Sequence, residues 1–145
     1  MFIDFLTDQF ENNFDSEAII WKDRSYSYKW LCDNINKCQR FIDSNQINEG
    51  TVIALEGDFS PNSIALLLAL IEKECIIVPL TNTSSKNENI LFDIAQVEFV
   101  FRINQRDIIS FESVFKQPEN NYYKVIKKSK HPGLVLFTSG TSGAP

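Results

Sequence analysis

Residues that form disulfide cross-links or bind metal are scarce in this chain of 145 residues, which has three cysteines and one histidine. Cys32, Cys38 and Cys75 are odd in number and lack the spacing of metal ligands, which excludes a disulfide framework and a zinc site. We expect reduced thiols in the core. His131 directly precedes Pro132 and has no serine or cysteine partner at a recognisable spacing, so it is assigned no catalytic role.

Long apolar runs are also absent. The longest, Ile64 to Ile71, is far shorter than the roughly 20 residues that span a bilayer. The first residues, Met1 to Asp8, lack the basic start of a signal peptide. The sequence therefore predicts a cytoplasmic protein without a transmembrane segment.

Positive charge is in deficit, since the formal net charge is −5. A general nucleic-acid binder needs clustered lysine and arginine, so this class is excluded. The one basic stretch, Lys124 to His131, could be a nucleic-acid patch or a solvated strand edge and linker. The second interpretation is preferred, because short blocks of like charge are usually solvated.

The chain has enough apolar residues for one packed core, with 43% hydrophobic residues and 12 phenylalanines. Apolar periodicity predicts helices near Phe2 to Phe14, over residues 28–44, from Pro61 to about Lys73 and around Lys86 to Gln96. It predicts a hairpin of Ala18–Trp21 with Ser25–Tyr28, and strands at Thr51–Leu55, Cys75–Val78, Phe99–Phe101 and Leu134–Phe137. Alternating strands and helices with short connections indicate an α/β fold with a mostly parallel, doubly wound layer.

Several finer details are predicted. Ser27 and Ser60 are placed to cap helices, with Pro61 at a first helical position. The helix near residue 90 should turn Ile90, Leu91, Ile94 and Ala95 inward. Short strands are expected at Ile108–Ile109, Phe111, Val114–Phe115 and Tyr122–Ile126, with an exposed loop at Pro118–Asn121.

The last eight residues, Thr138-Ser-Gly-Thr-Ser-Gly-Ala-Pro145, follow an apolar run and suit phosphate binding. Gly140 and Gly143 let the backbone turn so that several N–H groups converge on one anion, and four hydroxyls surround them. The pattern is not the Walker form, which needs Gly-Lys-Ser/Thr. A flexible tail would share this composition, but the order of the residues favours a phosphate loop.

This segment resembles the signature of the AMP-forming adenylating enzymes, the superfamily of acyl-CoA synthetases, amino-acid adenylation domains and luciferases. Val135 to Pro145 match each available position, and the signature's lysine would be residue 146. Upstream, Ser27–Leu31 is similar to the family's Thr-Tyr-x-Glu-Leu, Val52–Leu55 to its early strand, and Ile64–Leu80 to its apolar helix and Val-Pro strand. Two departures are Glu74, where the family usually has glycine, and Trp30, where it has glutamate.

The resemblance implies that residues 1–145 are a partial N-terminal, AMP-binding domain and that the remainder of the large domain and the C-terminal domain are absent. It implies an ATP-dependent acid-activating ligase that forms an acyl adenylate and releases pyrophosphate, with ATP and Mg²⁺ as cofactors. The β- and γ-phosphates would be held by Thr138, Ser139, Gly140, Thr141, Ser142 and Gly143. No catalytic residue is assigned.

The implied partners are a carboxylic acid and, as acceptor, coenzyme A or a carrier-protein thiol. The segment Pro132–Thr141 slightly favours the acyl-CoA synthetase branch. The isolated chain is expected to catalyse no adenylation. Two alternatives remain open, a non-catalytic phosphate-binding module and an inert, truncated interaction domain with exposed apolar surface.

Overall fold

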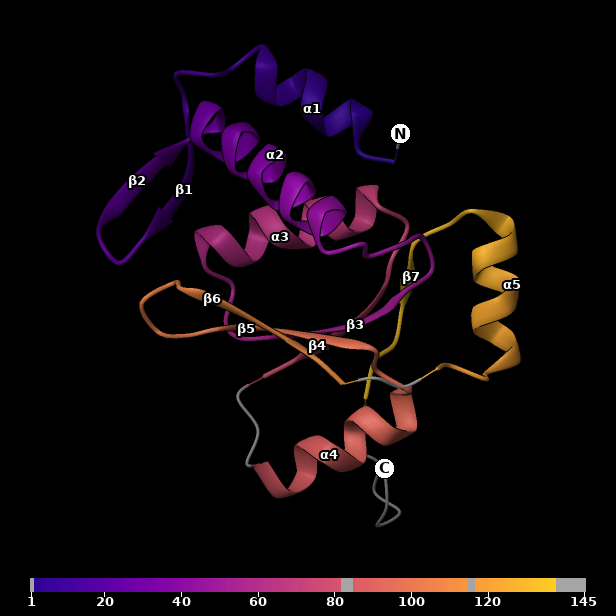
Figure 1. Ribbon diagram of the computed structural model, residues 1–145. Helices are drawn as coiled ribbons and strands as arrows, with labels where there is room; N and C mark the ends of the chain where they lie inside the picture. The colour runs from indigo at the N-terminus through magenta and orange to yellow at the C-terminus, as the bar shows by residue number, and fades with distance from the viewer. Residues whose placement is uncertain (1, 82–84, 115–116, 138–145) are drawn as a thin grey trace.

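The centre of the sheet consists of three parallel strands, β3 (Val52–Glu56), β4 (Ile76–Leu80) and β5 (Phe99–Ile103). This computed structural model describes residues 2–81, 85–114 and 117–137. Every residue of β3 is buried, as a strand covered on both faces requires. The strand order is β6-β5-β3-β4-β7 (Figure 1).

The two edge strands differ in direction. β6 (Ile109–Ser113) runs antiparallel to β5, whereas β7 (Gly133–Leu134) runs parallel to β4. The predicted α/β fold with a mostly parallel layer is therefore confirmed, with one antiparallel strand at the edge.

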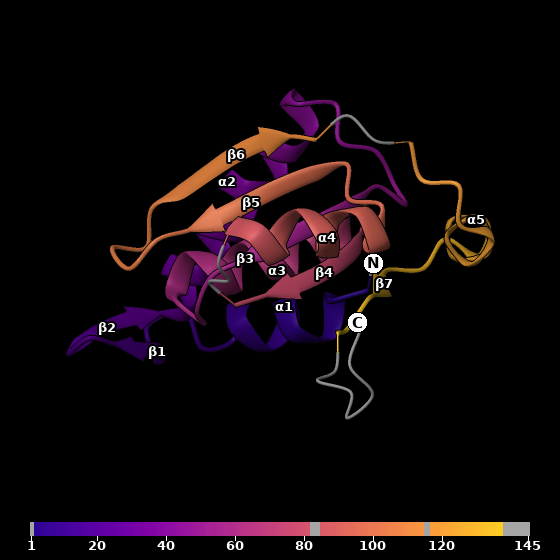
Figure 2. The ribbon, with the colours of Figure 1, turned by 90° about the horizontal axis from the view of Figure 1, so that it is seen from below.

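Helices α3 (Pro61–Glu72) and α4 (Ser85–Ala95) cover opposite faces of the sheet (Figures 1 and 2). The chain steps from β3 to its neighbour β4, then returns past β3 to reach β5. Crossover connections between parallel strands are right-handed. The two connections run in opposite directions across the sheet, so α3 and α4 lie on opposite faces. The face under α3 buries Ile53, Leu55 and Phe101, and the face under α4 buries Ala54, Val78 and Val100.

The segment before β3 adds a layer outside α3. It comprises α1 (Asp4–Glu11), the antiparallel hairpin of β1 (Glu17–Trp21) and β2 (Arg24–Ser27), and α2 (Tyr28–Ser44), which packs on α3. Ser27 caps α2 as predicted, because its Oγ accepts a hydrogen bond from Trp30 N at 3.2 Å. The reciprocal half of a capping box needs a carboxylate at residue 30, where this chain has tryptophan.

Three of the predicted helix and strand assignments were wrong, at least in part. Tyr122–Ile126 lies in helix α5 (Asn121–Ser129), not in a strand, so the basic stretch is mostly helical rather than a strand edge. Asn120 caps α5 by accepting from Tyr122 N at 2.9 Å, a local signal that overrides the β propensity of the tyrosines. In α4, Ala95 is buried and Leu91 packs against the core as predicted, but Ile90 and Ile94 are about half exposed, and Phe92 is buried instead.

The third detail concerns the segment before the glycine-rich end. Only Gly133–Leu134 forms a strand, although Val135 N continues the ladder by donating to Ile77 O at 2.9 Å. Leu134 and Leu136 are exposed while Val135 and Phe137 pack against the core below α4. This alternation is that of an edge strand with one covered face, not of the fully buried strand expected from the apolar run.

Helix α3 ends in a Schellman motif around the residue that departs from the family pattern. Cys75 N donates to Leu70 O and Glu74 N to Ile71 O, each at 3.0 Å. Glu74 has φ +57°, in the left-handed region. Glycine, the usual residue of the family at this position, adopts the left-handed conformation without strain. A residue with a Cβ is less stable in it.

Replacing Glu74 with glycine is therefore expected to raise the free energy of unfolding by up to about 1 kcal/mol. The measurement is the midpoint of chemical unfolding. Glu74→Ala, which keeps a Cβ in the same backbone conformation, is the matched control and should stay close to the wild type. If the free energy of unfolding rose as much in the alanine variant as in the glycine variant, the carboxylate of Glu74, and not its φ angle, would limit stability.

The three cysteines are free thiols, as predicted, but only Cys75 is buried in the core, while Cys32 and Cys38 are partly exposed. Burial raises the pKa of Cys75 to about 12 and that of Cys38 to about 11. Because the thiolate is the nucleophilic form, both groups are poorly reactive near neutral pH.

Candidate functional site

The carboxyl ends of the parallel strands form the edge at which the sheet can bind a ligand. At the end of β3 the chain turns to α3 on one face, and at the end of β4 it turns toward α4 on the other. Such a switch point opens a crevice outside the strand ends. Gly57 directly follows the end of β3. Its N–H donates to Leu80 O at 3.0 Å, and a Cβ there would stand 2.8 Å from Ile103 O. Only glycine leaves room for the backbone of residue 57 to lie this close to the carbonyl oxygen of Ile103.

The predicted phosphate-binding residues, Thr138 to Gly143, lie outside the described residues. The strand that leads to them is described. β7 is parallel to β4, so its carboxyl end points to the same edge as the crevice. The structure thus brings the residues just before the predicted loop to the edge where a ligand site is expected.

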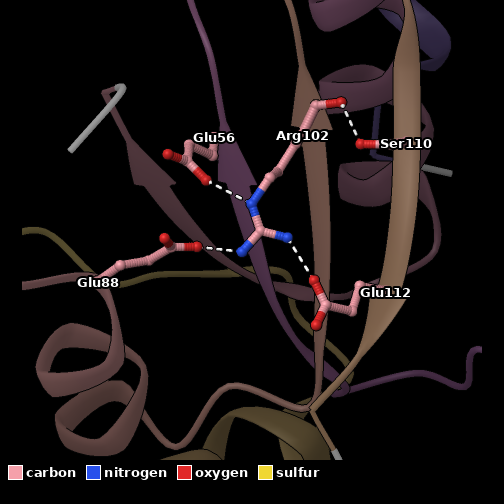
Figure 3. Close-up of polar contacts among 5 residues, drawn as sticks. All are labelled: Glu56, Glu88, Arg102, Ser110 and Glu112. Atoms are coloured by element: carbon pink, nitrogen blue, oxygen red, sulfur yellow. Dashed lines mark hydrogen bonds and ion pairs between the residues drawn. The ribbon is translucent and has the colours of Figure 1, made fainter. Parts of the chain in front are cut away.

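One arginine joins four elements at this edge (Figure 3). Arg102 on β5 donates from Nε to Glu56 on β3 at 2.9 Å and from Nη1 to Glu112 on β6 at 2.5 Å. Its Nη2 donates to Glu88 in the first turn of α4. Its own carbonyl accepts a hydrogen bond from Ser110 Oγ at 3.3 Å.

This arginine cluster, defined as Arg102 with Glu56, Glu88 and Glu112, has an excess of negative charge. Three carboxylates surround one guanidinium, and the side chains of Glu56 and Glu88 are only 8% and 14% exposed. Partial burial lowers the pKa of Arg102, but the hydrogen bonds that it donates to Glu88 and Glu112, together with the negative charges of Glu88 and Glu56, raise it more, and the net shift is upward. The guanidinium therefore stays charged and holds β3, β5, β6 and α4 together.

Sequence reasoning left this cluster unassigned. The sequence alone gave no role to Glu56 or to Arg102. The sequence does show one charged residue in each of two otherwise apolar strands, Glu56 at the end of Val52–Glu56 and Arg102 in Phe99–Ile103. These two residues lie opposite each other because the strands pair. Strand pairing is not visible in a single sequence.

A second buried polar group lies at the start of α3. Ser60 occupies the N-cap position, but its side chain does not cap the helix, so that prediction was wrong. Its Oγ donates instead to Asp107 Oδ1 at 2.5 Å, and the Asp107 carboxylate accepts from Asn62 N at 3.1 Å. A residue of the β5–β6 turn thus supplies the cap that the serine was expected to give.

Two negative findings apply to the part of the chain that the structure describes. Residues 2–81, 85–114 and 117–137 contain no group of three or more His, Cys, Asp or Glu side chains that could hold a metal ion. Within the same ranges, no helix is both long and apolar enough to cross a bilayer.

No protein-family model matches the sequence. Two curated proteins do. The chain is 24% identical over 135 residues to a hybrid PKS-NRPS synthetase, xenE, of Xenoacremonium sinensis, and 22% identical over 149 aligned positions to bacitracin synthase 3 of Bacillus licheniformis. These alignments cover 84% and 93% of this chain but only 3% and 2% of those much longer proteins.

Among solved structures, the N-terminal subdomain of Klebsiella oxytoca NpsA, in complex with 3-hydroxybenzoyl-AMSN, matches with a TM-score of 0.69 at 17% identity. The match covers 96% of this chain and 38% of that one. The fold is that of the N-terminal part of an adenylation domain. The resemblance to AMP-forming adenylating enzymes, predicted from the terminal motif, is thereby confirmed.

NpsA also matches as an artificial adenylation–PCP fusion, with a TM-score of 0.68 at 16% identity over 93% of this chain and 28% of that one. The chain therefore spans well under half of each adenylation protein described here.

Proposed function

We propose that this chain is the N-terminal portion of an ATP-dependent acid-activating ligase. In that reaction a carboxylate attacks the α-phosphate of ATP, pyrophosphate leaves, and an acyl adenylate forms. The observation that supports the proposal most is that β7, which leads directly to the glycine- and hydroxyl-rich segment, lies parallel to β4 and ends at the crevice edge of an adenylation fold.

The proposed role of Thr138 to Gly143 is electrostatic. Their backbone N–H groups and hydroxyls would hold the β- and γ-phosphates and stabilise the leaving pyrophosphate. Mg²⁺ is implied by the resemblance, but the described residues contain no group of three or more His, Cys, Asp or Glu side chains that could hold it. No step is assigned to the ion.

The acid and the acceptor are proposed only by class. NpsA was solved with 3-hydroxybenzoyl-AMSN and as a fusion with a PCP. By analogy, the acid would be a small carboxylic acid and the acceptor a carrier-protein thiol. Coenzyme A, and with it the acyl-CoA synthetase-like version, is proposed from the sequence motif alone. A cytoplasmic location is likewise proposed from the sequence alone, on grounds other than the motif.

Binding of ATP by the chain tests this proposal. We expect titration with ATP and Mg²⁺ to raise the melting temperature in a saturable way, because a ligand bound only to the folded state stabilises it. Gly140→Pro should abolish the shift, since proline removes an N–H and fixes φ. Ser142→Ala should weaken it, whereas Ser129→Ala, which removes an exposed hydroxyl at the end of α5, should not.

A chain that shows no saturable shift would contradict the proposal. Pyrophosphate exchange by the pure chain would contradict a narrower expectation, that these 145 residues alone are inactive.

The alternative of an interaction domain has one observation in its favour. Ile90, Ile94, Leu134 and Leu136 are each about half exposed or more. A concentration-dependent sedimentation profile without an ATP-induced shift would favour that alternative.

A further inference from the structure

A cavity of about 320 Å³ lies at the amino ends of the parallel strands, the end of the sheet opposite to the crevice. Gly50 and Thr51 directly precede β3, and Glu98 directly precedes β5. Helix α5 contributes Lys124 and Lys127 to the lining of this amino-end cavity. Ligand pockets span about 300–1,000 Å³, so this volume admits only a small molecule.

The hydroxyl of Thr51 has no hydrogen-bond partner among the described residues, although Thr51 is only 7% exposed. No buried side-chain nitrogen or oxygen in that part of the chain lacks a partner, so Oγ1 keeps some access to solvent. The amino-end cavity is the space that Thr51 lines. Its hydroxyl therefore offers a donor and an acceptor to a molecule held there.

The carboxylate of Glu98 is only partly engaged. Its Oε2 accepts a hydrogen bond from Val52 N at 2.8 Å, whereas Oε1 has no partner among the residues that the structure describes. Desolvation raises the pKa of Glu98, although the hydrogen bond from Val52 and the charge of Lys127 act in the opposite direction. A half-buried carboxylate without an ion pair favours a cation that reaches it.

Lys124 and Lys127 line the same cavity, and neither forms an ion pair with a residue in the described ranges. A Cβ on Gly50 would stand 2.9 Å from Cβ and Cγ of Lys127, so the glycine leaves room for the lysine stem. The charge of Lys127 acts on Glu98 without contact between the two side chains. The cavity thus holds charges of both signs that are not paired with each other.

We propose that the amino-end cavity binds a small zwitterion. Its carboxylate accepts hydrogen bonds from Lys124, Lys127 and the Thr51 hydroxyl, and its ammonium donates to Oε1 of Glu98. A ligand with a single charge is attracted by one side of the cavity and opposed by the other, whereas a zwitterion is complementary to both. This inference does not rest on the proposed function, because the cavity and the crevice lie at opposite ends of the strands.

Titration of the chain with γ-aminobutyrate, followed by NMR of the backbone amides, tests the proposal. Butyrate and butylammonium are the matched probes, since butyrate lacks the ammonium and butylammonium has a methyl group in place of the carboxylate. We expect saturable shifts at Gly50, Thr51 and Glu98. The dissociation constant of γ-aminobutyrate should be at least about tenfold lower than that of either probe, because hydrogen bonds to charged groups are the strong ones.

Variants assign the two ends of the ligand. Glu98→Gln keeps an acceptor for Val52 N and should weaken γ-aminobutyrate at least about fivefold while it strengthens butyrate. Lys127→Gln should weaken γ-aminobutyrate and butyrate but not butylammonium. Thr51→Val keeps the branched shape and should weaken γ-aminobutyrate about threefold. Lys128→Gln, on the same helix outside the cavity, is the control and should change each dissociation constant by less than about twofold.

The lysine variants decide the matter even where Glu98→Gln does not fold, because Lys124 and Lys127 are exposed. The inference is overturned if γ-aminobutyrate gives no saturable shift, if butyrate or butylammonium binds as tightly, or if Lys127→Gln keeps the affinity of the wild type. A chain that binds γ-aminobutyrate but not ATP would overturn the proposed function alone.

Discussion

Replacing Phe101 with alanine is expected to lower the free energy of unfolding by about 3–5 kcal/mol, because the substitution leaves a cavity in a packed core. Phe101 is 1% exposed and lies on β5 among the residues buried under α3. Its ring centroid is 4.9 Å from that of Phe111 and 5.9 Å from that of Phe41. The side chain therefore joins the sheet to α2, and its loss would loosen both layers.

Urea unfolding monitored by circular dichroism would measure this effect. Phe59, which is 79% exposed, offers the matched control, and Phe59→Ala should change the stability by less than about 0.5 kcal/mol. Equal losses at the two positions would show that Phe101 is not the core residue that the fold requires.

Replacing Asp107 with alanine should cost about 2–4 kcal/mol, because two groups lose a hydrogen-bond acceptor at once. The Ser60 hydroxyl, in a residue 1% exposed, would be buried without its partner, and Asn62 N would lose its cap. Asp107 also has φ +63°, a conformation that alanine adopts at a further cost and aspartate tolerates better.

Two further variants separate these causes. Asp107→Gly removes the acceptor but relieves the backbone, so it should be less destabilising than Asp107→Ala by about 1 kcal/mol. Asp107→Asn keeps an acceptor oxygen and tolerates the same backbone conformation, so it should be the mildest of the three. A glycine variant as unstable as the alanine variant would assign the whole effect to the lost hydrogen bonds.

The candidate site was predictable only where its signal is local in sequence. The glycines and hydroxyls at 138–143 follow an apolar strand directly, so the motif indicates a phosphate loop, although those residues lie outside the described part of the chain. The arginine cluster was missed because its charges come from four elements. Arg102 is 46 residues from Glu56 in sequence, and only strand pairing brings them together.

The same distinction holds for the helix ends. Ser27 caps its own helix through a residue three positions away, and its role was predicted. Ser60 is also a serine at an N-cap position, yet the helix N–H of Asn62 donates to Asp107 on a distant turn. The buried carboxylate of Asp107 can accept hydrogen bonds from both Ser60 Oγ and Asn62 N. Tyr122–Ile126 was misassigned for a related reason, since weak strand propensity was outweighed by a cap and by the burial of Tyr123.

The sequence by itself determined the alternation of strands and helices, the parallel sheet and the terminal motif, because apolar periodicity and helix caps act over a few neighbouring residues. It also marked Glu74 as a residue in place of glycine, and the structure gives it the left-handed φ of +57° that such a position implies. Only the tertiary structure decided the antiparallel edge strand, the cap from Asp107 and the cluster around Arg102. Each of these depends on strand pairing and burial between residues far apart in the chain, and these contacts form only when the whole sheet is assembled.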